Sequence, residues 1–315
     1  MNPPKGGTMN HTTVHQAQPA RGVEPPFGPL QELMRDESVE EIWINRPNEI
    51  WFFSNSKSTR LIVELGRQDI ERMLERMLRA TYRRLDRSRP FIDATLSDGS
   101  RLHAVVPDIT RENISINIRK FAKKSPTLEG LLSSGFFTQA QFDQLVGAVQ
   151  LGGSILVSGA TQAGKTTLLT AILNSFDASE RVVSVEDTFE LKLLCPDWVA
   201  MQTRPTASNE VDDVDLRRLL RESLRMRPTR LAVGEVRGAE AIELLVALNS
   251  GIPAYCTIHA NSAIEAIDKL VSLPLMATTS ISSKFVRKVF ERSVSLVVHC
   301  QTSNGVRRVT EVLEP

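Results

Sequence analysis

The run Gly159-Ala160-Thr161-Gln162-Ala163-Gly164-Lys165-Thr166 matches the pattern G-x-x-x-x-G-K-[ST]. An apolar stretch, residues 154–157, precedes the run, and a helical pattern that begins at Thr167 follows it. Glycines in such a strand-to-helix turn let backbone amides and the helix N-terminus face phosphate groups. The run and Thr167 therefore predict a phosphate-binding loop, in which Lys165 reaches the β- and γ-phosphates of ATP and the Thr166 hydroxyl completes the shell of a Mg²⁺ ion.

The second half of the chain alternates short β-branched runs with helical stretches, which is typical of a doubly wound α/β sheet. Capping boxes, Thr138-x-x-Gln141 and Ser262-x-x-Glu265, mark two helix starts. We expect strands at residues 155–157, 182–185, 231–233, 256–258 and 295–298, and helices that begin at Lys165, Asp215, Ala239 and Ser262.

In the first half of the chain, strand-like runs lie on both sides of one long helical pattern. Turn signals at Pro47-Asn48 and Asp98-Gly99 separate pairs of these runs. We expect strands at residues 41–45, 50–53, 92–96, 102–106 and 114–118, and helices at residues 30–34 and 69–85. The sequence therefore predicts a small α+β domain at residues 30–121, a basic linker at residues 122–126 and an α/β domain at residues 127–315.

Length and composition narrow the class of protein. A chain of 315 residues fits two domains, and 38 basic against 37 acidic residues leave a formal charge of +1. This balance gives no sign of a protein that coats nucleic acid. The three cysteines, Cys195, Cys256 and Cys300, lack metal-ligand spacing, so we expect neither a zinc site nor a disulfide framework, and a reducing compartment fits best.

We expect no secretory signal peptide in the N-terminal region. Residues 1–29 are rich in Pro, Gly, Asn and Thr and lack the apolar core of a signal peptide, so we expect a disordered tail. No stretch approaches the ~18 apolar residues that a membrane-spanning helix needs. These observations predict a cytoplasmic protein whose contact with a membrane is peripheral.

Residues 230–235 form an apolar strand pattern that ends in an acid, Glu235. Ligands of open α/β sheets bind at the carboxyl ends of the strands, so Glu235 is a candidate for orienting and deprotonating an attacking water molecule. Gly234 stands where an Asp that helps to hold Mg²⁺ is usual. An exposed acid at a strand end is the alternative interpretation.

Two further strand ends carry polar side chains. The strand pattern at residues 182–185 is followed by three acids, Glu186, Asp187 and Glu190, whose carboxylates suit Mg²⁺ and water. The candidate metal ligands are Glu186, Asp187 and Thr166. His259 stands between a strand and a capped helix, where a histidine near a γ-phosphate could sense the nucleotide by a hydrogen bond. A solvated loop and a structural histidine are the alternatives.

Together these motifs resemble the type II/IV secretion ATPase superfamily, in the CpaF/TadA branch that powers tight-adherence (Flp-type) pili. The Walker A run, acidic box, Walker B run and histidine box of that family resemble residues 159–166, 186–191, 231–238 and 257–262. Characteristic strings are Arg225-Met226-Arg227-Pro228, Asp98-Gly99-Ser100-Arg101 and Ile118-Arg119-Lys120. The chain departs from the family at Gln162-Ala163, where Gly-Ser is more usual, and at Thr229, where Asp is common.

The resemblance implies an α/β fold with a RecA-like P-loop ATPase domain preceded by a small α+β domain. It also implies a hexameric ring of identical chains at the inner face of the cell membrane, with ATP and Mg²⁺ as cofactors. ATP binding would close the two domains, and the ring would drive an inner-membrane platform protein of the pilus. No direct nucleic-acid partner is expected.

The family's functional residues carry over by motif. Lys165 and Thr166 would bind the phosphates and Mg²⁺, with Glu235 as the catalytic carboxylate. Glu190 would assist water or metal, and His259 would contact the γ-phosphate region. Four arginines complete the set, because a planar guanidinium matches phosphate oxygens: Arg101 and Arg119 as first-domain contacts to nucleotide, and Arg204 and Arg237 as candidates for reaching a neighbouring subunit.

Other functions are compatible with the same motifs. They are a conjugation-type ATPase that exports DNA or protein, a nucleotide-regulated assembly factor with little hydrolysis, and a small-molecule kinase, for which the sequence offers no substrate lid. The basic helix face from Arg72 to Arg89 fits a solvated surface, a subunit contact or attraction to anionic lipid.

Overall fold

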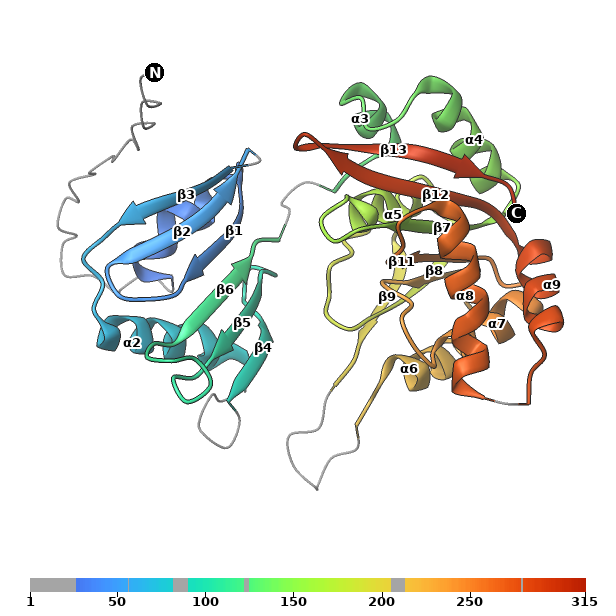
Figure 1. Cartoon of the computed structure of the whole chain (residues 1–315). Coiled ribbons are helices and arrows are strands. Elements are labelled where there is room, and N and C mark those ends of the chain that lie inside the picture. Colours follow the sequence, from blue (N-terminus) through green and yellow to red (C-terminus); the bar gives the residue numbers. More distant parts are fainter. Residues whose placement is uncertain (1–26, 56, 82–89, 122–124, 205–212, 279) are drawn as a thin grey trace, which may run out of the picture. The chain divides into compact units, whose positions relative to one another are not determined.

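The computed structural model describes residues 27–55, 57–81, 90–121, 125–204, 213–278 and 280–315 (Figure 1). The chain divides into two compact units, Met1–Lys123 and Lys124–Pro315. Residues 1–26 of the predicted tail and 122–124 of the predicted linker lie outside the described residues. In the part of the chain that is described, no helix is both long enough and apolar enough to cross a membrane.

The first unit is built on a six-stranded sheet with the order β3-β2-β1-β6-β5-β4, in which all neighbours are antiparallel. Its strands are β1 (Val39–Ile44), β2 (Glu49–Ser54), β3 (Lys57–Ile62), β4 (Phe91–Thr95), β5 (Arg101–Val105) and β6 (Ser115–Arg119). The structure confirms the predictions for all of these except β3. Edge strand β3 is mostly polar and exposed, so it lacks the apolar alternation that marks a half-buried strand.

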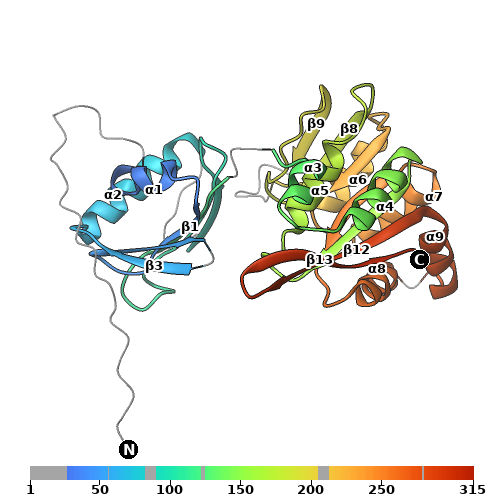
Figure 2. The ribbon, with the colours of Figure 1, turned by 90° about the horizontal axis from the view of Figure 1, so that it is seen from above.

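Helices cover one face of this sheet (Figure 2). They are the 3₁₀-helix η1 (Gly28–Leu30), α1 (Gln31–Arg35), α2 (Arg67–Leu78) and the 3₁₀-helix η2 (Arg79–Thr81). Their apolar side chains share one core with the strands, in which Leu30, Ile42 and Met73 are fully buried. This packing gives the first unit a hydrophobic core of its own.

Three boundaries in this unit differ from the prediction. Residues 27–29, predicted as part of the tail, are ordered instead, because the apolar ring of Phe27 packs into the core and η1 follows directly. Helix α2 begins at Arg67 rather than Asp69, because the Asp69 carboxylate accepts a hydrogen bond from the Gly66 amide at 2.9 Å and so belongs to the first turn. The α-helix ends at Leu78, and residues 82–89, which include the end of the basic face, lie outside the described residues.

The second unit is built on a seven-stranded sheet with the order β13-β12-β7-β11-β10-β8-β9 (Figure 1). Its strands are β7 (Ser154–Gly159), β8 (Arg181–Glu186), β9 (Asp197–Gln202), β10 (Arg230–Val233), β11 (Ala254–Ile258), β12 (Val294–Ser303) and β13 (Val306–Leu313). Neighbours are parallel except for the antiparallel hairpin β12–β13. Strands β9 and β13 were not predicted.

Helices pack on both faces of this sheet (Figures 1 and 2). The core on one face contains side chains of α3 (Leu128–Ser133), α4 (Gln139–Gln150) and α5 (Lys165–Leu173). The core on the other face contains side chains of α6 (Leu216–Ser223), α7 (Ala241–Asn249), α8 (Ala263–Ala277) and α9 (Ser283–Ser293). Strands β7 and β11 are buried at every position, as expected for parallel strands covered on both sides. The predicted doubly wound α/β fold is confirmed.

The predicted capping boxes form, one in full and one with a shifted partner. The Thr138 amide donates to Gln141 Oε1 at 2.8 Å, and the Gln141 amide donates to Thr138 Oγ1 at 3.3 Å. At α8, Ser262 Oγ accepts from the Glu265 amide at 3.1 Å, but the Glu265 carboxylate accepts from the amide of Asn261 instead of Ser262. In both helices the side-chain oxygen satisfies a backbone amide that has no partner within the helix.

Candidate nucleotide site

The carboxyl ends of β7, β11, β10 and β8 lie along one edge of the second sheet, because these strands are parallel neighbours. The predicted phosphate-binding loop follows β7, and the candidate residues His259, Glu235 and Glu186 stand at the ends of the other strands. Sheet order therefore gathers segments that are far apart in the sequence, at the edge where open α/β sheets bind ligands.

The loop itself depends on two glycines. A Cβ atom on Gly159 would lie 2.3 Å from the carbonyl oxygen of Cys300 on β12, which no side chain could tolerate. Gly164 precedes α5 with a φ of +93°, and a Cβ atom there would lie 2.9 Å from Cε2 of Phe136. Both positions need glycine for the loop to keep its path.

The departure from the family at Gln162-Ala163 leaves this path intact. Gln162 has a φ of +62°, in the left-handed region that favours glycine, which accounts for the usual glycine at this position. Ala163 is buried in the core beside α5, where a small side chain fits.

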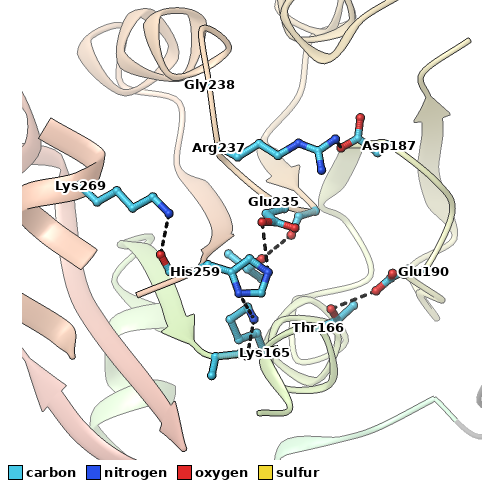
Figure 3. Close-up of polar contacts among 12 residues, drawn as sticks. Lys165, Thr166, Asp187, Glu190, Glu235, Arg237, Gly238, His259 and Lys269 are labelled. Atoms are coloured by element: carbon cyan, nitrogen blue, oxygen red, sulfur yellow. Dashed lines mark hydrogen bonds and ion pairs between the residues drawn. The ribbon is translucent and has the colours of Figure 1, made fainter. Parts of the chain in front are cut away.

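Lys165 is the first residue of α5, and its ammonium group lies beneath the loop. Nζ donates a hydrogen bond to the carbonyl oxygen of Ala160 at 2.7 Å and lies 3.2 Å from Nδ1 of His259 (Figure 3). The side chain is buried, and a buried ammonium requires such partners. The lysine is therefore held at the base of the loop.

His259 connects Lys165 to Glu235. Its Nε2 atom lies 3.2 Å from Oε1 of Glu235 (Figure 3). An ammonium group can only donate, so Nδ1 of a neutral His259 accepts from Lys165 while Nε2 donates its proton to the Glu235 carboxylate. Lys165, His259 and Glu235 thus form one polar chain across β7, β11 and β10.

The acidic segment after β8 contacts the loop through Glu190. Thr166 Oγ1 donates to Glu190 Oε2 at 3.2 Å (Figure 3). Glu186 is buried instead, and its Oε1 accepts from the amides of Glu190 and Leu191 at 2.8 and 2.9 Å. Glu186 therefore holds the backbone that presents Glu190.

Gly234 has a steric role beside Glu186. A Cβ atom on Gly234 would lie 3.0 Å from Cγ of Glu186. An Asp at position 234 would therefore need the buried Glu186 side chain to shift.

Asp187 pairs with Arg237, which follows Glu235 on the neighbouring loop (Figure 3). Burial raises the pKa of Asp187, the Arg237 guanidinium opposes this, and the nearby carboxylates of Glu240 and Glu235 raise it further. The Arg237 side chain is therefore held by its own unit, although it was predicted as a candidate for reaching a neighbouring subunit.

None of the hydrogen bonds and ion pairs described above for this group involves the remaining three candidate arginines. Arg204 pairs its backbone with Val214 at 2.9 and 3.0 Å, on either side of residues 205–212, which lie outside the described residues. Arg101 and Arg119 are opposite one another on β5 and β6 of the first unit.

The donors at the loop fit a hard cation in part. The Thr166 hydroxyl and the Glu190 carboxylate are oxygen ligands of the kind that Mg²⁺ prefers, and Mg²⁺ usually keeps several waters. Glu186 and Asp187 are engaged with backbone amides and with Arg237. Within the described ranges, no three His, Cys, Asp or Glu side chains gather as a ready metal cluster.

Two supporting residues escaped the sequence reasoning. Glu240 is buried, and its Oε1 accepts from the amides of Arg237 and Gly238 at 2.6 and 2.7 Å, so the helix predicted from Ala239 begins at Ala241. Lys269 Nζ donates to the His259 carbonyl at 2.9 Å (Figure 3). Acids are favoured at helix starts, and this preference is a sequence signal for the role of Glu240. Lys269 lies in the middle of a helix, where the sequence gives no comparable signal.

The fold and this edge of the sheet define a RecA-like α/β protein with a phosphate-binding loop. The pilus retraction motor PilT, solved with bound ADP, shares the fold at a TM-score of 0.66 and 18% identity, covering 91% of this chain and 82% of that one. The family described as Type II/IV secretion system protein matches residues 24–313. The chain belongs to this family.

Two relatives show how far the similarity extends. The conjugal transfer protein TrbB of Rhizobium radiobacter is 34% identical over 233 residues, which cover 72% of this chain and 68% of the relative. The type IV secretion system protein VirB11 of Bartonella henselae is 27% identical over 323 residues and 90% of each chain.

Proposed function

We propose that this chain hydrolyses ATP with Mg²⁺ as a subunit of a hexameric ring that powers a type II/IV secretion machine. The observation that carries the proposal is the polar chain from Lys165 through His259 to Glu235, next to the Thr166–Glu190 contact. It joins a phosphate-binding lysine to a carboxylate at a strand end, the two groups that phosphoryl transfer to water requires.

Each residue has a chemical role in this proposal. The amides of the loop and Lys165 bind the phosphates, and Glu235 orients and deprotonates the attacking water. His259 holds Glu235 and contacts the γ-phosphate, while Thr166 and Glu190 would hold the metal and its water shell. Mg²⁺, when bound, neutralises charge on the β- and γ-phosphate oxygens.

The test of this proposal is Mg²⁺-dependent ATP hydrolysis by the full chain. Lys165→Ala should lower turnover by about 100-fold or more, because it removes a cation from the developing phosphate charge. Lys284→Ala, on the exposed face of α9, is the matched control and should leave turnover unchanged. Hydrolysis that stays at background in the wild type, or survives in Lys165→Ala, would contradict the proposal and favour an assembly factor that only binds nucleotide.

For the machine that the ring drives, we propose a tight-adherence pilus of the CpaF/TadA type. The strings at residues 225–228, 98–101 and 118–120 support this, and the partner would be an inner-membrane platform protein. The location would be the cytoplasm at the inner face of the membrane. Loss of pili after deletion of the gene would support this pathway.

A conjugation-type machine is the second candidate, favoured by the similarity to TrbB and VirB11. Loss of DNA or protein transfer after deletion, with pili retained, would decide for it. Neighbouring genes give an independent criterion: prepilin and platform genes favour the pilus, and relaxase or coupling-protein genes favour conjugation.

The arginines and the linker enter the proposal through the two-unit cycle of the family. ATP would close the units by a hinge at residues 122–126, with Arg101 and Arg119 supplying first-unit contacts to the phosphates. Ser125 and Pro126 belong to the second unit, in which Ser125 Oγ donates to the Lys192 carbonyl at 3.1 Å and Asn174 Nδ2 donates to the Pro126 carbonyl at 3.0 Å. Arg204 and, once released from Asp187, Arg237 are the candidates for action across a subunit boundary.

A further inference from the structure

A buried polar pair lies directly beneath the phosphate-binding loop. Ser158 Oγ lies 2.9 Å from Nδ1 of His299, and the two side chains are 0% and 3% exposed. Ser158 on β7 and His299 on β12 are partners in the parallel ladder, and the next pair is Gly159 with Cys300. The pair therefore joins the end of β7, just before the loop, to the neighbouring strand.

Both side chains lie on the face of the sheet that is covered in part by α8, the helix that follows the His259 segment. Leu156 and Val297, two residues before Ser158 and His299, belong to the core on that side of the sheet. Glu311 on β13 is the cross-strand partner of His299, and its Oε2 accepts from the amide of Ala263, the first residue of α8, at 2.9 Å. The histidine thus stands between the loop strand and the start of α8.

Stability alone does not account for this pair. The positions before it, residues 155–157 on β7 and 296–298 on β12, are apolar and buried. Replacing both members of a buried polar pair by apolar groups of similar shape is often neutral or stabilising. A hydrogen bond differs from an apolar contact in that it is directional, so it fixes where the backbone of Ser158 lies.

The protonation state of His299 allows its Nδ1 atom to accept a hydrogen bond. Burial lowers the pKa of His299; Glu311 on β13 and Glu265 on α8 oppose this, and Lys165 on α5 adds to it. At neutral pH the ring is therefore uncharged. The other acceptor for the Ser158 hydroxyl, the Val298 carbonyl, is farther away at 3.5 Å, so Nδ1 is the better partner.

We propose that His299 is a positioning residue for the phosphate-binding loop: neutral Nδ1 accepts a hydrogen bond from Ser158 and fixes the end of β7 from which the loop amides project. The carbonyl oxygen of the next residue, Cys300, packs against Gly159 and so contacts the same end of β7. This inference rests on the proposed nucleotide binding. It adds to the site a residue of β12, a strand other than the four whose carboxyl ends form the site.

The test compares ADP affinity, by calorimetry, with thermal stability in four full-chain variants. His299→Leu and Ser158→Ala each remove the hydrogen bond, and the double variant removes both partners. His299→Asn is the conservative rescue, because its amide oxygen is attached to Cγ as Nδ1 is. We expect both single variants to weaken ADP binding about 5- to 10-fold, and His299→Asn to stay within about twofold of the wild type. The double variant should match the single ones in affinity and unfold no earlier than either.

The pH dependence provides a second measurement. Acidification should weaken ADP binding more in the wild type than in His299→Asn, because only the imidazole loses its acceptor on protonation. Nitrogen NMR of His299 should show Nδ1 without a proton at neutral pH.

Equal ADP affinity in the wild type and Ser158→Ala would overturn the role of His299 while leaving the proposed function intact. So would His299→Asn behaving like His299→Leu. If His299→Leu does not fold, Ser158→Ala and the pH comparison decide. Absence of ADP binding by the folded wild type would overturn the proposed function and, with it, this inference.

Discussion

Nζ of Lys165 lies 3.2 Å from Nδ1 of His259, so the lysine of the phosphate-binding loop touches the histidine at the end of β11. Because the same imidazole reaches Glu235, the three groups form a continuous chain of polar contacts. Phosphate oxygens at the loop would compete with His259 and the Ala160 carbonyl for the lysine protons. Binding would thereby change the contacts of Glu235 through a single side chain.

Removing this imidazole should separate catalysis from binding. His259→Ala leaves Lys165 bonded to Ala160 but deprives Glu235 of its donor. We expect turnover to fall about 10- to 100-fold while ADP affinity stays within about threefold. His103→Ala, an exposed histidine of the first unit that pairs with Asp93, is the control. Unchanged turnover in His259→Ala, measured at saturating ATP, would remove His259 from the mechanism.

Two glycine-to-alanine substitutions should have opposite effects on stability. Gly159→Ala brings a Cβ atom to 2.3 Å from the Cys300 carbonyl, and overpacking of this kind costs about 1–3 kcal/mol or more. Gly147→Ala, in α4, meets nothing within 4 Å and should stabilise by about 0.5–1 kcal/mol through helix propensity. Denaturant unfolding measures both, and equal stability of the two variants would contradict the geometry of the loop.

Glu186 should matter for stability and Glu190 for turnover. Glu186→Ala leaves the amides of Glu190 and Leu191 without this acceptor, and we expect a loss of about 2–4 kcal/mol in the free energy of unfolding. Glu190→Ala removes a part-exposed carboxylate and should cost less than about 1 kcal/mol, yet lower Mg²⁺-dependent hydrolysis. A reversed order of stability would show that Glu186 is not the residue that holds this segment.

The Asp187–Arg237 pair predicts a dependence on pH. The pKa of Asp187 is already raised in the folded state, so the folded protein binds its proton more readily and this carboxyl lowers stability as the pH rises through the folded pKa. Arg237→Met removes the group that opposes the shift. Its destabilising effect should therefore be larger at neutral pH than at acid pH, where Asp187 is protonated. The measurement is urea unfolding at both pH values.

Asp187→Asn provides the control for that measurement, since its side chain cannot ionise. Adding Arg237→Met to Asp187→Asn should give a cost that is nearly independent of pH. A cost of Arg237→Met that grows on acidification would contradict the assigned sign.

Much of the site could be predicted because it lies in local motifs. A glycine-rich run between a strand and a helix, and acids at the ends of apolar strands, are visible in a short window of sequence. The contacts among them were not predictable, because they depend on sheet order. Only the position of β7 beside β11 brings Lys165 to His259, 94 residues away.

The features that escaped prediction have physical reasons. Edge strand β3 is polar, and edge strand β9 is only half-buried along its length, so neither shows the pattern of a buried strand. The hairpin β12–β13 turns at Asn304-Gly305, both with positive φ, a signal that the prediction did not use. The Ser158–His299 pair joins residues 141 apart, each of which directly follows an apolar run, 155–157 or 296–298.

The central claim is tested most directly by ATP hydrolysis measured against protein concentration for the wild type and Glu235→Gln, with oligomer size recorded in parallel. A ring ATPase with Glu235 as its catalytic carboxylate predicts specific activity that rises as rings form and is lost in the variant. Activity that is independent of assembly, or that survives in Glu235→Gln, would contradict it.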